Sequence, residues 1–261
     1  MKSELDLLFI GDIVGRPGRE MTARTLERMR QENQPDLIIA NGENSAGGFG
    51  LTEAIYHELL DMGVGVVTLG NHAWDKSEIF DFISEADRLI RPLNFPEGTP
   101  GTGFTVADVD GIPVGVINVM GRAFMAPMDC PFRAVDKAIA AIGGETRVIF
   151  VDVHAEATAE KRGLAYHLDG RVSAVVGTHT HVQTADECIL PGGTAFLTDA
   201  GMTGPIHSVI GMKVEGAVRK MVTQLPCRLE VAEGPAQFNA VRVRIEVETG
   251  RAISIERLNY R

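Results

Sequence analysis

The sequence has few cysteines and no long apolar run. Its three cysteines, Cys130, Cys188 and Cys227, lie far apart, and none forms a Cys-x-x-Cys pair. The odd count and the wide spacing argue against a disulfide framework or a zinc ribbon and predict reduced, buried thiols. No apolar run approaches membrane-spanning length, and the N-terminal Met-Lys-Ser-Glu-Leu-Asp lacks the pattern of a signal peptide. We therefore expect a soluble, cytoplasmic protein with no membrane partner.

Positive charge is also scarce. The 261 residues include 25 lysines and arginines against 35 aspartates and glutamates, which gives a formal net charge of -10 and a pI near 5.2. A general nucleic-acid surface requires a basic face, so we expect none here. A small anionic substrate remains compatible with this charge if the site itself concentrates positive charge. The sequence leaves the oligomeric state open, a homo-oligomer included.

Internal repeats, low-complexity tracts and flexible linkers are absent too. The hydrophobic fraction of 44% and the charged fraction of 23% are those of an ordinary globular protein with a sizeable core. A chain of this length forms one large α/β domain or two small ones. Because no linker divides it, we predict a single domain over 1–261.

The first part of the chain alternates between apolar runs and amphipathic segments. Strands are expected at 5–10, 36–40 and 64–69, and helices at 19–30 and 52–62. Gly15, Pro17 and Gly18 are expected to interrupt the chain before the first helix, and Thr52 is expected to cap the second. This order is typical of parallel βαβ units, whose ligands gather beyond the carboxyl ends of the strands.

The rest of the chain contains several predicted hairpins. The expected strand pairs are 104–109 with 113–119, 187–190 with 194–198, and 237–247 with 252–258. The other expected elements are a strand at 147–153, helices at 132–142, 156–168 and 214–223, and a loop at 199–211. The late hairpins predict that a second sheet packs on the first.

A candidate metal site begins at the apolar run 172–177, which delivers His179 and His181 just beyond its end. In an extended segment side chains alternate, so these two imidazoles are expected to point to the same side. Imidazole is a common metal ligand, although two such histidines can also simply cap a loop. Asp12, Glu43 and Asn71 each follow one of the first three predicted strands. They favour a metal site at the carboxyl ends of the strands.

The strand-end residues occur in five ordered motifs. These are Gly11-Asp12, Gly42-Glu43-Asn44, Gly70-Asn71-His72, His154, and Thr178-His179-Thr180-His181. In this order they resemble the motifs of the calcineurin-like metallophosphoesterases. Two segments, Gly-Glu-Asn-Ser-Ala-Gly-Gly-Phe-Gly from Gly42 and Val-Asp-Val-His-Ala-Glu-Ala-Thr from Val151, more closely resemble the bacterial YmdB-like subfamily. The resemblance spans nearly the whole chain.

The resemblance implies a four-layer αββα sandwich with two packed mixed sheets. It also implies hydrolysis of phosphodiesters, notably of 2′,3′-cyclic nucleotides such as 2′,3′-cAMP, with two divalent metal ions per chain. Oxygen and imidazole ligands without thiolate suit iron or manganese, and zinc is also acceptable. Two such ions against the carboxylates of Asp12 and Glu43 leave roughly +2 in the site, which holds a phosphate anion. The implied reaction is attack by a metal-bridging hydroxide.

The resemblance also assigns a role to each residue. With Glu43 as the bridge, the implied ligands are Asp12 and His181 on one ion, and Asn71, His154 and His179 on the other. Asn44 lies close to the first ion or to the phosphate. His72, adjacent to a ligand, is the implied general acid that protonates the leaving oxygen. Asp75 either orients His72 or caps a helix.

The chain departs from the wider superfamily at two positions. Ile13 and Val14 follow Asp12 where the superfamily pattern has Asp-x-His, so one metal is expected to lack a histidine and to be more open to water. Glu43 stands where the superfamily generally has aspartate. Both departures match the YmdB-like subfamily, so metal preference and substrate are not transferred from the better-known phosphatases.

Other candidate residues are weaker. His207, in the glycine-rich loop 203–211, is a lower-ranked candidate for substrate contact, as is Asn44. Asp152 is expected to face away from the site. Arg16 and Arg19 could contact phosphate, and Phe49 and Trp74 could stack on a base, but surface and packing roles are favoured for these four residues. His57 and His167, within predicted helices, are assigned structural roles.

Three functions are compatible with these motifs. The leading one is a dinuclear metal-dependent phosphodiesterase that acts on cyclic nucleotides or other small phosphodiesters. The second is a regulatory protein that binds a nucleotide or an RNA end through the same metals with little turnover, and the third is a phosphomonoesterase. A pure binding protein needs no general acid, so His72 favours the enzyme. The missing Asp-x-His histidine argues against the phosphomonoesterase.

Overall fold

Apolar side chains occupy both faces of the first strand. In the computed structural model, which describes residues 2–261, β1 (Glu4–Ile10) directs Leu7 and Phe9 into one core and Leu8 and Ile10 into another. Successive side chains of a strand point to opposite faces, so a strand that is apolar on both must be covered on both. The sheet that contains β1 therefore has packing layers on its two sides.

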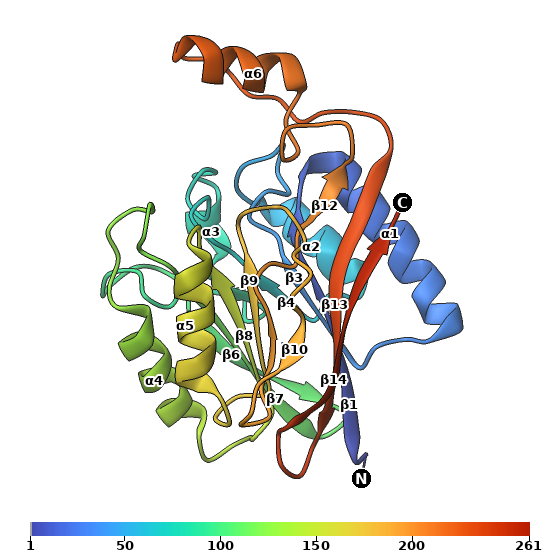
Figure 1. The fold of residues 1–261 in the computed structure, drawn as a ribbon, viewed down its shortest axis with the longest axis vertical. Coiled ribbons are helices and arrows are strands. Elements are labelled where there is room, and N and C mark those ends of the chain that lie inside the picture. The colour runs from blue at the N-terminus through green and yellow to red at the C-terminus, as the bar shows by residue number, and fades with distance from the viewer. Residues whose placement is uncertain (1) are drawn as a thin grey trace.

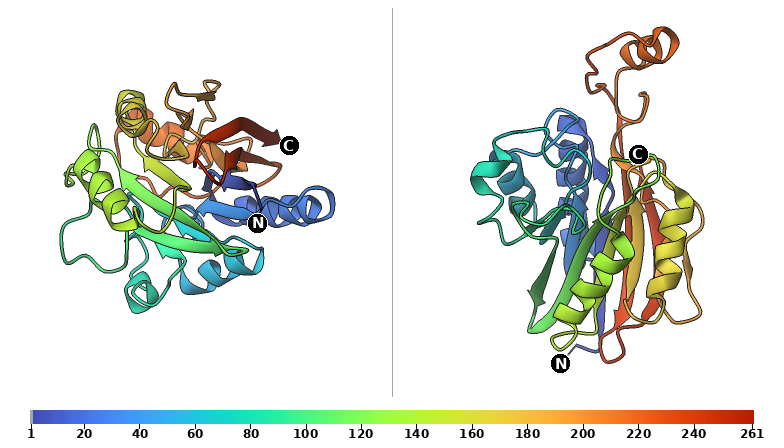
Figure 2. Two further views of the ribbon diagram at one scale, coloured as in Figure 1. Left: turned by 90° about the horizontal axis from the view of Figure 1, so that it is seen from below. Right: turned by 90° about the vertical axis from the view of Figure 1, so that its left-hand side faces the viewer.

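The strand β8 (Ile149–His154) is buried in the same two-sided way. Its Phe150 enters the core that contains Phe9, and the centroids of the two rings lie 4.9 Å apart. Val151 and Val153 face a third core on the opposite side of β8. Three cores separate four layers, in the order helices, sheet, sheet, helices (Figure 2). The predicted αββα sandwich of two packed mixed sheets is confirmed.

The first sheet combines the two ends of the chain. Besides β1 it contains β2 (Asp12–Ile13), β3 (Leu37–Asn41), β4 (Val66–Thr68), β5 (Leu89–Ile90), β12 (Met202–Pro205), β13 (Ala236–Glu246) and β14 (Ala252–Tyr260). The strand order is β2-β12-β13-β1-β3-β4-β5, and β14 pairs with β13. The strands β1, β3, β4 and β5 are parallel, as the βαβ pattern predicts, whereas β13 is antiparallel to β1.

The second sheet is formed by the middle of the chain. It contains β8 with β6 (Phe104–Val109), β7 (Ile112–Met120), β9 (Ala174–Thr178), β10 (Cys188–Ile189) and β11 (Ala195–Leu197). The strand order is β10-β11-β9-β8-β7-β6. The four central strands are parallel, and β6 and β10 are antiparallel edge strands. The two hairpins predicted in this part of the sequence are confirmed.

The closing hairpin joins the first sheet, so its expected place in the second sheet is wrong. β13 pairs with β1, and its Val241 and Val243 enter the core between the sheets. The sequence correctly predicts β13 as a strand of the closing hairpin. It does not identify the partner strand, because any neighbour with a matching apolar face satisfies the same pattern.

Helices cover the outer faces of both sheets. α1 (Gly15–Glu32), α2 (Glu53–Asp61) and α3 (Ile79–Phe82) pack on the first sheet, and α4 (Pro131–Ile142) and α5 (Thr158–Leu168) pack on the second (Figure 1). α6 (Val214–Thr223) has the predicted bounds and extends beyond the end of the sandwich, as Figure 1 and the right-hand view of Figure 2 show. None of the helices within residues 2–261 has both the length and the apolar character needed to cross a membrane.

The structure corrects three local predictions. α1 begins at Gly15, not at Arg19, because Pro17 fits the first turn of a helix, where its missing N–H is not needed. The predicted loop 199–211 contains the short strand β12, which pairs with β2. The cysteines are free, as predicted, but each is partly exposed rather than buried. The predicted cap is confirmed, since the hydroxyl of Thr52 accepts a hydrogen bond from the Ile55 N–H at 3.4 Å.

Candidate metal centre

The predicted metal ligands come from the carboxyl ends of strands in both sheets. The first sheet supplies Asp12, Glu43, Asn44 and Asn71, and the second supplies His154, His179 and His181. Parallel strands end at the same edge of a sheet, so the packing of the two sheets brings both sets together. All seven residues make contacts with other members of the set.

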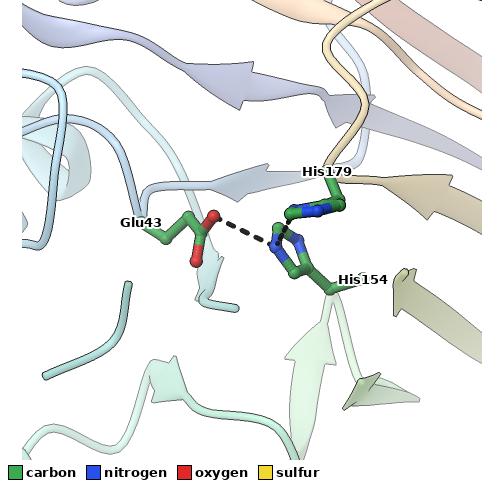
Figure 3. A group of neighbouring side chains, drawn as sticks. All are labelled: Glu43, His154 and His179. Carbon is green, nitrogen blue, oxygen red and sulfur yellow. Dashed lines mark hydrogen bonds and ion pairs between the residues drawn. The ribbon is translucent and has the colours of Figure 1, made fainter. Parts of the chain in front are cut away.

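One half of the site is centred on His154. Its Nε2 lies 3.0 Å from Oε1 of Glu43, 3.1 Å from Nδ1 of His179 and 2.8 Å from Oδ1 of Asn71. Glu43, His154 and His179 come from three different strand ends and point toward one another (Figure 3). Each offers a ligand atom, and these atoms lie within 4.8 Å of one another. The geometry is that of a group of residues able to share one cation.

The other half of the site contains Asp12 and His181. Nε2 of His181 lies 3.6 Å from Oδ1 of Asp12. The Nδ2 of Asn44 lies 3.2 Å from Nε2 of His181, 3.5 Å from Oδ1 of Asp12 and 3.3 Å from Oε1 of Glu43. Asn44 therefore belongs to this half, and Glu43, which contacts both Asn44 and His154, lies between the two halves.

Each of the three histidine rings also contacts a residue that is not a proposed ligand. The outer contacts are Nδ1 of His154 with the Thr178 hydroxyl at 2.9 Å, Nδ1 of His181 with the Ile210 carbonyl at 2.9 Å, and Nε2 of His179 with the Glu156 carboxylate at 3.2 Å. A hydrogen bond at one ring nitrogen places the proton there and leaves the other nitrogen free to bind a metal. In all three rings the free nitrogen faces the centre. This arrangement fits divalent metal ions.

Burial and the space beside Gly70 also fit metal ions. Asp12 and His154 are 0% exposed and Glu43 is 1% exposed, so charge in the centre must be balanced locally. A β-carbon at Gly70 would lie 2.3 Å from Nε2 of His154 and 2.5 Å from Oε2 of Glu43. Glycine at this position leaves the ligand atoms free to converge.

The protein's own charges perturb the pKa values strongly. Burial alone would raise the pKa of the Asp12 and Glu43 carboxyls, but His181 beside Asp12 and His154 beside Glu43 outweigh burial and lower both. Burial likewise opposes the charge on His181, yet Asp12 raises the pKa of that imidazole to about 9. The pKa of His179 falls to about 4 through burial and the neighbouring His154. Metal ions and protons therefore compete for the same ring nitrogens.

The turn that carries His179 and His181 is not extended, so the alternation argument made from the sequence is wrong. The φ angles of His179 and His181 are 96° and 64°, in the left-handed region that side chains rarely adopt. The peptide between them is held by Asp199, which accepts hydrogen bonds from the N–H of Thr180 at 3.1 Å and from its hydroxyl at 2.6 Å. Both histidines reach the centre because the hydrogen bonds to Asp199 hold this turn in its left-handed conformation.

A buried ion pair supports that turn. The ammonium of Lys161, on α5, donates to Asp199 at 2.7 Å, and both side chains are 0% exposed. The other oxygen of Asp199 accepts from the N–H of Gly201 at 2.8 Å. Sequence reasoning missed both charged residues, because neither belongs to a metal-binding motif and they are far apart in the chain.

Asp152 faces the site, so the expectation that it faces away is wrong. It accepts a hydrogen bond at 2.7 Å from the Thr178 hydroxyl, which in turn contacts His154. The hydroxyl of Thr68 donates to its other oxygen at 2.5 Å, and burial raises the pKa of Asp152 to about 6. The signal was present in the sequence, because residues two apart on a strand share a face and His154 follows Asp152 at that spacing.

His72 occupies a different position from the ligands. Its Nδ1 lies 2.8 Å from Oδ2 of Asp75, and its backbone N–H donates to Glu43 at 2.9 Å. Phe49 contacts the His72 ring edge-on, with centroids 4.9 Å apart. His72 lines a cavity of about 350 Å³ next to the centre, together with Glu43 and Asn44. Of the two roles considered for Asp75, the structure shows the contact with His72.

The remaining candidates lie elsewhere. His207 is exposed and does not line the cavity, whereas Val209 and Ile210 of the same loop do. Arg19 contacts Glu58 and the Ser45 carbonyl rather than the centre. Four others are occupied in surface or packing contacts away from the cavity, namely Arg16, His57, Trp74 and His167. Phe49 is the one of this group that lines the cavity.

Comparison with known proteins identifies the family. The model of the YmdB-like protein family matches residues 8–258. The 2′,3′-cyclic-nucleotide 2′-phosphodiesterase of Bacillus subtilis strain 168 is 51% identical over 252 residues, which cover 97% of this chain and 96% of that protein. Solved structures of a hypothetical protein from Thermus thermophilus and of a phosphatase from Mycoplasma pneumoniae are also similar.

The two structural matches span nearly the whole fold. The Thermus protein has a TM-score of 0.92 and 44% sequence identity, with 98% of this chain and 99% of that chain covered. The Mycoplasma protein has a TM-score of 0.93 and 32% identity, with 100% of this chain and 94% of that chain covered. The resemblance drawn from the sequence motifs is confirmed, and the chain belongs to the YmdB-like family.

Proposed function

We propose that the protein is a metal-dependent phosphodiesterase that hydrolyses 2′,3′-cyclic nucleotides. The observation that carries this proposal is the arrangement of three imidazoles, each held from outside, with their free nitrogens directed at two buried carboxylates. The family, and the activity named for the Bacillus subtilis relative, support the same conclusion. We also propose that the protein acts in the cytoplasm.

The proposed cofactor is a pair of divalent ions, iron or manganese, with zinc as an acceptable substitute. The residues that would hold them are Asp12 and His181 on one side, Asn71, His154 and His179 on the other, and Glu43 between. Asn44, whose amide nitrogen faces Asp12 and His181, would lie close to the first ion or to the phosphate. Such ions neutralise phosphate charge and activate water. The protein contributes the buried oxygen and nitrogen ligands and the hydrogen bonds that orient them.

His72 is the proposed general acid. In its imidazolium form His72 donates Nδ1–H to Asp75, which holds the ring in one orientation, and it gives its second proton, on Nε2, to the leaving oxygen, leaving a neutral imidazole. Because the His72 backbone also contacts Glu43, the acid is fixed relative to the metal ligands. The proton added to the leaving oxygen completes the cleavage of the phosphate ester bond.

Two alternative functions, a regulatory nucleotide-binding protein and a phosphomonoesterase, can be distinguished from the phosphodiesterase by experiment. A regulatory nucleotide-binding protein has no use for the pairing of His72 with Asp75, so this contact favours turnover. A phosphomonoesterase is the second alternative, favoured by the description of the Mycoplasma pneumoniae protein as a phosphatase. The ratio of diester to monoester hydrolysis separates the two enzymes.

The test of the function is hydrolysis of 2′,3′-cyclic AMP by protein stripped of metal with a chelator. We expect no turnover until manganese or iron is added, and slower hydrolysis of a monoester such as p-nitrophenyl phosphate under the same conditions. Both activities are measured with the metal content of each sample. Absence of diester turnover in metal-loaded protein, or equal turnover with and without metal, would contradict the proposal.

The substitution His72→Ala tests the general acid. Turnover of the cyclic nucleotide is expected to fall by about 10² to 10⁴, the usual contribution of such a group. Metal content is expected to stay the same, because the His72 side chain is not a proposed ligand. His57→Ala, which changes an exposed histidine on α2, serves as the control. Loss of metal from the His72 variant would refute its role as the acid.

The substitution Lys161→Met tests the support of the histidine turn. Asp199 would be left as a buried charge without its partner, so we expect a loss of about 3 kcal/mol in the free energy of unfolding. The turn at Thr180 should also loosen and weaken metal binding, which is followed by equilibrium titration with manganese below the unfolding temperature. The control is Arg162→Met, which removes a partly exposed ion pair. Unchanged manganese affinity in the Lys161 variant would show that the turn does not need the ion pair.

A further inference from the structure

We propose that the cavity beside the metal centre holds the nucleobase of the substrate, and that α6 with its flanking loops forms the roof of this subsite. The inference rests on the proposed function, which supplies the phosphate at the floor of the cavity. The part of the substrate that is recognised is then the nucleobase, and the segment that recognises it is α6 with its flanking loops. The metal centre itself can bind any small phosphate ester, so selectivity must arise elsewhere.

The cavity has two chemically different sides. Its floor includes His179 and His181 of the centre and the neighbouring His72. Its volume of about 350 Å³ lies within the usual range of small-molecule sites, roughly 300–1,000 Å³. A phosphate at the floor cannot fill this space, so the remainder is available to the rest of the substrate.

The roof is built mainly from apolar side chains of the segment 209–229. Met212 and Ala217 are buried there, and Ile210 and Leu229 complete much of the apolar wall. α6 projects beyond the sandwich (Figure 1), so this part of the chain is displaced from the three cores of the fold. Its inner side instead borders the cavity.

Phe49 connects the roof to the reacting end of the site. Its ring lines the cavity and contacts His72 edge-on. If His72 protonates the leaving oxygen, the sugar that carries this oxygen lies next to Phe49, and the base attached to the sugar extends toward the roof. Aromatic and apolar walls bind the faces of a base by stacking and by dispersion.

Two polar side chains of α6 and its end complete the subsite. Lys220 and Gln224 line the same cavity, and both carry N–H donors. A base presents ring nitrogens and carbonyl oxygens at its edge, which accept hydrogen bonds from such donors. An apolar roof with a few donors is the usual composition of a site that binds a flat heterocycle. The occupant that fits is therefore a nucleobase.

The experiment compares a nucleotide with a diester that lacks the base. The substrates are 2′,3′-cyclic AMP and 1-O-methylribose 2′,3′-cyclic phosphate, tested on metal-loaded protein. We expect kcat/KM to be higher for the nucleotide by about tenfold or more, the usual effect of stacking one base. Ala217→Phe fills the roof and should remove most of this preference, chiefly through a higher KM for the nucleotide. The base-free diester should still be hydrolysed, which shows that the variant is folded and holds its metals.

The matched control places the same side chain on the outer side of the same helix. Val222 is 77% exposed, so Val222→Phe should retain the full preference for the nucleotide. Equal kcat/KM for the two substrates in the unmodified protein would overturn the subsite. A parallel fall for both substrates in the Ala217 variant would overturn it too.

A binding measurement separates this proposal from the proposed function. Adenosine 3′-monophosphate and ribose 3-phosphate are titrated calorimetrically into the same protein and into both variants. If neither diester is hydrolysed, the proposed function fails. The subsite still stands if the nucleotide binds more tightly and Ala217→Phe abolishes the difference. Equal affinity for the two phosphates contradicts the subsite whether or not turnover occurs.

Discussion

The buried contact between Lys161 and Asp199 supports the part of the structure on which the candidate metal centre depends. Asp199 holds Thr180 by its N–H and its hydroxyl, and the residues on both sides of Thr180 have left-handed backbone angles. Each such angle costs about 1–3 kcal/mol, so the turn persists only because other contacts over-determine it. The ammonium of Lys161 lies against this buried carboxylate and balances its charge. The two histidines reach different halves of the centre as a result.

A second constraint is the convergence of two sheets at one edge. The first sheet supplies oxygen ligands and the second supplies imidazoles, so neither sheet alone forms the centre. Contacts behind the ligands fix their direction, most clearly in the series from Asp152 through Thr178 to His154. The chain is acidic overall, yet two divalent ions among these ligands would present positive charge to a phosphate. A local charge of this kind lets an acidic protein accept an anionic substrate.

The sequence predicts the fold and the members of the site, but not how the histidine turn is built. Strand-end motifs predict every proposed ligand, because parallel strands must end together. The alternation rule fails at His179, where Asp199 overrides the extended conformation through a contact distant in sequence. The same rule, applied to Asp152 and His154, identifies the residue behind the ligand. The pairing of β13 with β1 and the place of α6 above the cavity depend on tertiary contacts, which periodicity does not contain.

The most direct test of this account is anomalous diffraction from crystals grown with manganese. The account predicts two manganese peaks per chain, both bonded to Glu43. One should also contact Asp12 and His181, and the other His154 and His179. Peaks in this arrangement would establish that the two sheets build one dinuclear centre. A single peak, or ions bound without Glu43, would contradict it.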